Sequence, residues 1–169
     1  MPACSKVLCA RILLAALAIV PVAEARAATR ITVTFDDVLK QTSPVNRDYR
    51  IQNTRKYTLD KNNNMTTTSS FNHDTSGGLG KSGTGTDVNG VTYAWTLRIV
   101  NGALVIVNDY PGFVSITRIR TNGKTSCSVT RDYNSKHGQF VISNSNHQNR
   151  TYSDFHTENL TCAIEQIPD

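Results

Sequence analysis

The chain has 169 residues and a formal net charge of +5, but residues 1–27 have the pattern of a secretion signal. The remaining 142 residues, one domain by size, carry 15 basic and 12 acidic side chains, and this small excess of positive charge does not suggest a nucleic-acid partner. Of these residues, 48 are Thr, Asn or Ser and only 13 are Ala, Leu, Glu or Met, which excludes a helical bundle or a coiled coil.

The N-terminal segment predicts export to the periplasm or the extracellular space. Lys6 and Arg11 precede an apolar run at residues 12–20, and Ala25 and Ala27 are the small residues that a signal peptidase recognises. The run is shorter than the ~20 residues that a spanning helix needs. We therefore expect cleavage after Ala27, a secreted domain at residues 28–169, and no transmembrane anchor in the mature chain.

From Arg30 onward, strand-like runs alternate with turn signals every 8 to 12 residues. This pattern predicts an all-β fold, a single antiparallel β-barrel or β-sandwich of about eight strands, meander-like, with one disulfide. Residues 30–35 form the first expected strand, and residues 36–41 are expected to make one helical turn. Near the end of the chain, residues 152–156 and 157–167 are expected to be separate strands.

Two Asn-Gly dipeptides predict β-hairpins, because this dipeptide suits turns that need positive φ. Around Asn101-Gly102, a two-residue loop pairs Val100 with Ala103 and Trp95 with Asn108. The core face of this hairpin then contains apolar and aromatic side chains, namely Val91, Tyr93, Trp95, Leu97, Ile99, Leu104, Ile106 and Tyr110.

The second dipeptide, Asn122-Gly123, leaves two registers open. A two-residue loop places Arg118 opposite Cys127. A three-residue loop with a left-handed Gly123 places Thr117 there and turns Arg118, Arg120 and Lys124 outward. We favour the second register because it keeps charge away from the interior.

Cys127 and Cys162 are the two cysteines that remain after signal removal, and we expect them to form a structural disulfide in an oxidising compartment. Neither belongs to a C-x-x-C pair. The bond would join the last strand to the strand before His137.

Between Ser76 and Gly90 the chain is rich in glycine and predicts a surface loop. It contains G-x-G-x-x-G, but no helix pattern follows, and its other partial matches to phosphate-binding and nucleophile motifs are incomplete. We therefore expect no nucleotide cofactor, and the four histidines match no zinc spacing, so no metal is expected either.

Two side-chain groups are candidates for chemistry. Asp154 and His156 share a strand face and could act as acid and base in a small secreted enzyme. Five basic residues at positions 118, 120, 124, 131 and 136 accompany only one acid, Asp132. They predict a surface for an anionic glycan or lipid headgroups, or a charged edge that prevents sheet aggregation.

As function, the sequence favours a non-enzymatic binding or interaction module over an enzyme, with no catalytic residue assigned. If it is a barrel, an inner cavity beside Trp95 would hold a small apolar ligand. The candidate ligand-binding residues are Tyr93, Trp95, Tyr110, Arg118 and Arg120. The alternatives are the enzyme with Asp154 and His156, and a secreted hydrolase inhibitor acting through the loop between Ser76 and Gly90.

Asn64, Asn149 and Asn159 begin glycosylation sequons, and the oligomeric state is left open.

Overall fold

The computed structural model describes residues 28–69, 75–87, 90–143 and 149–168, so the expected signal segment lies outside the described residues. The described chain contains eleven strands and no helix, and therefore no helix that could cross a membrane. The strands are β1 (Ala28–Ser43), β2 (Arg47–Leu59), β3 (Asn64–Ser69), β4 (Thr75–Gly78), β5 (Ser82–Thr86), β6 (Thr92–Val100), β7 (Ala103–Asp109), β8 (Phe113–Asn122), β9 (Ser126–Ser135), β10 (Phe140–Ser143) and β11 (Asn149–Ile167).

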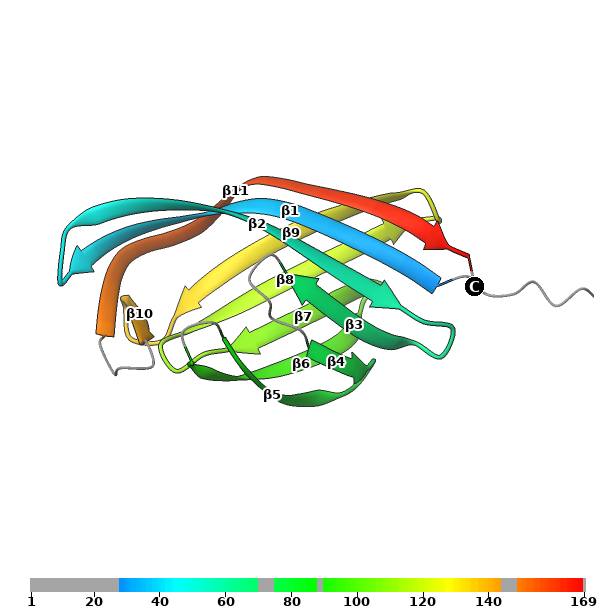
Figure 1. The fold of residues 1–169 in the computed structure, drawn as a ribbon, viewed down its shortest axis with the longest axis horizontal. Helices are drawn as coiled ribbons and strands as arrows, with labels where there is room; N and C mark the ends of the chain where they lie inside the picture. The colour runs from blue at the N-terminus through cyan, green and yellow to red at the C-terminus, as the bar shows by residue number, and fades with distance from the viewer. Residues whose placement is uncertain (1–27, 70–74, 88–89, 144–148, 169) are drawn as a thin grey trace, which may run out of the picture.

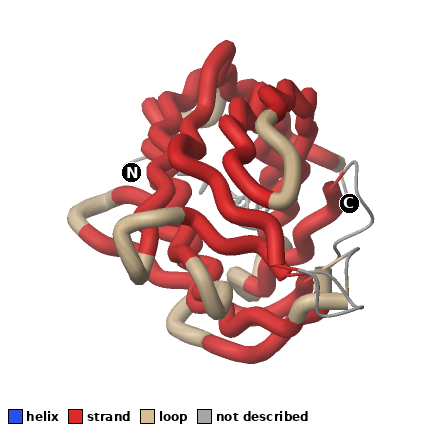
Figure 2. Tube along the Cα trace, turned by 90° about the vertical axis from the view of Figure 1, so that its left-hand side faces the viewer, coloured by secondary structure: helices blue, strands red, loops and turns tan. Residues whose placement is uncertain are grey.

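The strands form two antiparallel sheets with two clusters of buried side chains, which confirms the predicted all-β fold as a sandwich or half-barrel, although the described residues form eleven strands rather than about eight. The first sheet has the order β10-β11-β1-β2-β3-β4, and the second is the meander β5-β6-β7-β8-β9. The long strands β1, β2 and β11 arch over the second sheet (Figure 1), and the described connections between strands are short loops (Figure 2).

Contacts hold the two sheets together along both sides. On one side the turn from β4 to β5 lies against β6, where the Gly80 amide donates to the Leu97 carbonyl at 2.8 Å. On the other side Cys127 of β9 and Cys162 of β11 form the expected disulfide, with Cα atoms 5.8 Å apart. The disulfide thus joins the last strand to the strand before His137, as the sequence predicts.

The first Asn-Gly hairpin has the predicted register. Val100 pairs with Ala103 and Trp95 with Asn108, and both Asn101 and Gly102 have positive φ. Its inner face is buried at Tyr93, Trp95, Leu97, Leu104 and Ile106. Ile99, which was expected in the core, is instead 55% exposed. It lies next to the hairpin tip, beyond the last residue of β6 that pairs with β5, Thr96.

The second Asn-Gly hairpin has the predicted three-residue loop with positive φ at Gly123. The residue opposite Cys127 is Thr121, however, and Thr117 pairs with Arg131. The expectation about Thr117 was wrong because the loop occupies positions 123–125, two residues later than the expected loop at positions 121–123. Arg118, Arg120 and Lys124 are exposed, as expected for this loop length.

We expected two strands of the first sheet to be interrupted, but both are continuous among the described residues. Residues 36–41, expected as a helical turn, continue β1, because they pair with β2 on one side and with β11 on the other. Residues 152–156 and 157–167, expected as two strands, belong to the single strand β11. Register shifts between β1 and β11 accommodate the curvature of these long strands, and Asn159 has a φ of 50° at one of them.

The glycine-rich segment is not one surface loop, because β4 and β5 occupy much of it. Gly83 and Gly85 lie under the rings of Trp95 and Tyr93, where an added Cβ atom would approach within 2.7 Å of each ring. These glycines therefore leave room for aromatic side chains of the neighbouring strand β6. The inhibitor alternative for residues 76–90 stays a prediction.

Candidate functional site

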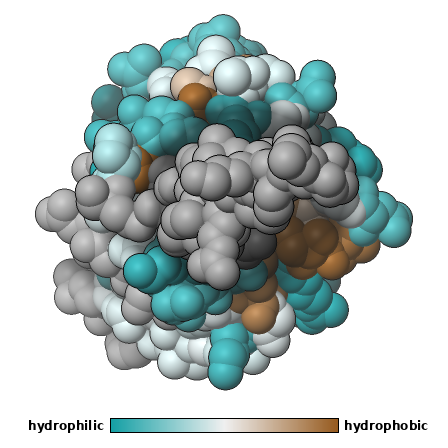
Figure 3. Space-filling view, turned by 90° about the vertical axis from the view of Figure 1, so that its right-hand side faces the viewer, coloured by the Kyte–Doolittle hydropathy of each residue, from teal (hydrophilic) through white to brown (hydrophobic). Residues whose placement is uncertain are grey.

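A large cavity opens between the ends of the two sheets, and we call it the end cavity. Its volume is about 780 Å³. The apolar floor comes from both sheets and consists of Ile31, Leu59, Leu104, Ile119 and Ile164. Figure 3 faces this end of the molecule and shows hydrophobic surface between hydrophilic residues.

Hydrogen bonds organise the polar rim of the end cavity. Asp60 holds the turn between β2 and β3, because its carboxylate accepts the Asn62 and Asn64 amides at 2.8 Å each. The side-chain hydrogen bond from Asn64 is the main cause that lowers the pKa of Asp60. Lys61 and Lys124 also line the rim, and neither forms an ion pair with another described residue. The rim is thus polar and partly cationic above an apolar floor.

A second, smaller cavity of about 180 Å³ lies between the sheets near the beginning of β8, and we call it the aromatic cavity. Four ring-bearing side chains line it: Tyr110, Phe113, Tyr133 and Phe155. The rings of Tyr110 and Phe113 stack at 4.6 Å, and those of Tyr133 and Phe155 stack at 3.8 Å. Polar lining side chains include Asp37, Asn53, Arg55, Ser115 and Arg131.

Arg131 and Asp37 form the centre of a buried polar network at this cavity. The Arg131 guanidinium donates to the hydroxyls of Tyr133, at 2.8 Å, and Thr117, at 2.7 Å. The Tyr133 hydroxyl donates to Asp37 at 2.6 Å, and the Asn53 amide donates to the same carboxylate at 2.9 Å. The Arg131 side chain is almost inaccessible to solvent, and these hydrogen bonds compensate for its burial. The main role of the network is therefore to stabilise the fold.

Burial dominates the ionisation of this network. It raises the pKa of Asp37, while the positive charge of Arg131 acts in the opposite direction. It also raises the pKa of Tyr133, and it raises the pKa of Tyr110 to about 12. Both tyrosines therefore stay protonated near neutral pH and are able to donate hydrogen bonds.

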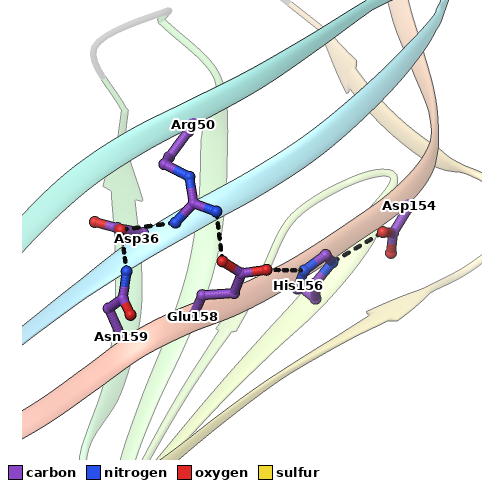
Figure 4. A network of polar contacts seen from close by, with 6 residues as sticks. All are labelled: Asp36, Arg50, Asp154, His156, Glu158 and Asn159. Carbon is purple, nitrogen blue, oxygen red and sulfur yellow. Dashed lines mark hydrogen bonds and ion pairs between the residues drawn. The ribbon is translucent and has the colours of Figure 1, made fainter.

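The candidate acid and base, Asp154 and His156, lie on the outer face of the first sheet (Figure 4). His156 bonds through one ring nitrogen to Asp154 at 2.8 Å and through the other to Glu158 at 3.2 Å. Glu158 also pairs with Arg50, which in turn bonds Asp36. The pKa of His156 is raised, mainly by the bond to Glu158. His156 borders a groove of about 450 Å³ between β9 and β11, but both of its ring nitrogens are already hydrogen-bonded to carboxylates.

The five candidate ligand-binding residues are not gathered into one site. Tyr93 and Trp95 belong to the packed core, and neither lines the end cavity or the aromatic cavity. Tyr110 lines the aromatic cavity. Arg118 pairs with Asp132, and Arg120 donates to the Asn101 carbonyl at 3.0 Å. Their role in ligand binding stays a prediction.

The basic cluster expected between residues 118 and 136 is divided between two environments. Arg131 points into the core with a side chain that is only 3% exposed, so its assignment to a basic surface was wrong. Lys136 pairs with Asp109. The alternation of faces along β9 could have predicted this burial, because Arg131 shares a face with Cys127, Val129 and Tyr133.

Asp37 and Arg55 were also missed by the sequence interpretation. Asp37 shares its strand face with Val33, Phe35 and Leu39, but the predicted helical turn concealed this alternation. No group of three or more His, Cys, Asp or Glu side chains in the described ranges could hold a metal ion. Comparisons with protein-family models, with curated proteins and with solved structures found no match.

Proposed function

We propose that this chain is a secreted or periplasmic, non-enzymatic binding module that holds a small apolar molecule in the end cavity. The observation that carries the proposal is a cavity of about 780 Å³ with an apolar floor and a polar rim. Ligand-binding pockets commonly have volumes of roughly 300–1,000 Å³, apolar walls and a few polar groups that orient the ligand.

The arrangement of the floor supports a cavity that exists before the ligand arrives. Ile31 pairs with Ile164 across β1 and β11, and Leu104 pairs with Ile119 across β7 and β8. These two cross-strand pairs belong to opposite sheets, which the disulfide joins. A floor fixed by two sheets and a covalent bond loses little entropy when a ligand binds.

The N-terminal segment and the two cysteines support the proposed location. A basic region, an apolar run and a small-residue cleavage site precede a domain whose two cysteines pair with each other. We expect the exported protein to begin at Ala28, which intact-mass measurement tests. An exported protein that retained residues 1–27 would contradict the assignment.

Binding of the uncharged fluorescent probe N-phenyl-1-naphthylamine tests the ligand site. Thr121 is exposed and lines the end cavity, so Thr121→Phe is expected to fill part of it while the fold persists. We expect the probe to bind the unsubstituted chain and to bind the variant about tenfold more weakly, since loss of cavity space of this kind costs on the order of 1.4 kcal/mol.

Thr68→Phe is the matched control, because Thr68 is an exposed threonine on β3 that does not line the end cavity. Its probe affinity is expected to equal that of the unsubstituted chain. If the probe does not bind, or if both variants weaken binding equally, the end cavity is not the ligand site.

A further inference from the structure

The aromatic cavity contains a positive charge, that of Arg55, which forms no ion pair within 4.0 Å with the described residues and acts on Asp37 only from farther away. Arg55 lies on β2, is half-buried and lines the cavity. Its guanidinium carbon is 5.9 Å from the centre of the Phe35 ring. Within the described part of the chain, no carboxylate oxygen lies within 4.0 Å of its nitrogens. Because a guanidinium stays charged at all ordinary pH values, this cation is permanently present in the cavity.

The neighbouring charges are already engaged elsewhere. Asp37 accepts hydrogen bonds from Tyr133 and Asn53 and lies 3.9 Å from Arg131. Asp87 also lines the cavity, and its carboxylate accepts the Val91 amide at 2.9 Å. Both carboxylates therefore have local partners, whereas the hydrogen-bond donors of Arg55 remain available to a bound molecule.

The other residues that line the aromatic cavity indicate the size and the aromatic character of the bound molecule. Tyr110 and Phe113 form a stacked aromatic pair, and Phe155 meets Phe113 edge-on with ring centres 5.4 Å apart. Ser115 adds a small polar group from β8. A volume of about 180 Å³ is smaller than most pockets for drug-sized ligands. The lining thus suits a compact aromatic body that carries one anionic group.

We propose that the aromatic cavity binds a small aromatic carboxylate, whose anionic group pairs with Arg55 while its ring packs beside Tyr110 and Phe113. A guanidinium and a carboxylate form two parallel charge-assisted hydrogen bonds, which are stronger than bonds between neutral groups. Partial burial of Arg55 reduces the screening of this pair by solvent. The site is separate from the end cavity and does not depend on the function proposed there.

Calorimetric titration with benzoate tests the proposal, with benzamide and acetate as comparison ligands. Benzamide keeps the ring and lacks the charge, whereas acetate keeps the charge and lacks the ring. We expect benzoate to bind at least about tenfold more tightly than either, because each comparison ligand loses one of the two kinds of contact. Benzamide or acetate binding as tightly as benzoate would overturn the proposal.

Arg55→Gln removes the charge, and Lys56→Gln is the matched control on the same strand. Lys56 is exposed and does not line the cavity. Arg55→Gln is expected to weaken benzoate binding about tenfold or more, and Lys56→Gln to leave it unchanged. Equal affinities for the two variants, or no benzoate binding to the unsubstituted chain, would overturn the proposal.

Amide chemical-shift changes in the unsubstituted chain test the site even if Arg55→Gln does not fold. Benzoate is expected to shift the amide signals of Tyr110, Phe113 and Ser115 and to leave those of Thr121 and Gln166 at the end cavity unchanged. Shifts confined to Thr121 and Gln166 would contradict the aromatic site while leaving the proposed apolar ligand site intact.

Discussion

Arg131 and Arg118 differ in burial although both lie on the same hairpin and face a carboxylate. Arg131 is almost inaccessible and bonds Tyr133 and Thr117, whereas the Arg118 side chain is 44% exposed and pairs with Asp132. A buried charge is costly to leave unpaired, while an exposed pair is screened by water. The two residues therefore have different consequences for stability.

Arg131→Met is expected to lower the free energy of unfolding by about 3–5 kcal/mol, because it leaves the buried Asp37 without its cation. Arg118→Met is expected to lower it by at most about 1 kcal/mol. Urea unfolding, followed by circular dichroism, measures both. Similar losses for the two variants would show that Arg131 is less buried than the structure indicates.

His156 predicts a dependence of stability on pH. Its pKa in the folded chain is raised above the ordinary value, mainly by Glu158, so the folded state binds the proton more tightly than the unfolded state. This stabilisation is fully present below the unfolded pKa and is lost as the pH rises through the folded pKa. His156→Gln should therefore reduce the unfolding free energy more at about pH 5.5 than at about pH 8.5.

Urea unfolding of both proteins at the two pH values measures this difference. His137→Gln is the control, because His137 is exposed in the turn before β10 and forms no ion pair with the described residues. A loss that is equal at both pH values, or larger at the higher one, would contradict the role of His156.

The short strand β5 illustrates how one element depends on its neighbour. Its residues alternate glycine with Ser or Thr, a composition that gives a strand little intrinsic stability. The rings of Trp95 and Tyr93 on β6 cover the two glycines. The rings pack directly on the backbone of the two glycines, and this contact stabilises an edge strand that has few side-chain contacts of its own.

Gly83→Ala is expected to displace the Trp95 ring and to lower the unfolding free energy by about 1–3 kcal/mol, because the new Cβ atom would lie 2.7 Å from the ring. Trp95 is the single tryptophan, so its fluorescence reports the displacement directly. At Gly78 the nearest atom to a new Cβ is 3.4 Å away on a flexible lysine, and Gly78→Ala should leave the emission unchanged. Unchanged emission in Gly83→Ala would contradict this packing.

The disulfide acts on the whole molecule, because it joins strands of different sheets that lie 35 residues apart in the sequence. Replacing both cysteines by serine should lower the unfolding free energy by about 3–4 kcal/mol, since the unfolded chain regains the freedom of that loop. Unfolding with and without a reductant should show the same loss in the unsubstituted chain. Cysteines that react with an alkylating agent before reduction would show that the bond is absent.

Several features of the whole molecule were predictable because they depend on composition or on local sequence. A high content of Thr and Asn with few helix formers predicts an all-β chain. Asn101-Gly102 determines both the turn and the register of its hairpin, since a two-residue loop of positive φ permits one pairing. Cys127 and Cys162, the two cysteines beyond the expected signal segment, were predicted to pair with each other, and the structure confirms their pairing.

The tertiary structure decided the features that depend on distant strands. Residues 36–41 extend as strand because β2 and β11 bond them from both sides, and β11 is distant in the sequence. Arg131 is interior because Asp37, 94 positions earlier in the chain, reaches the same network from the other sheet. Both cavities likewise combine side chains of the two sheets. Local sequence determined the all-β class and the first Asn-Gly hairpin, whereas the full extent of β1 and β11 and both candidate sites arose from long-range strand pairing and sheet packing.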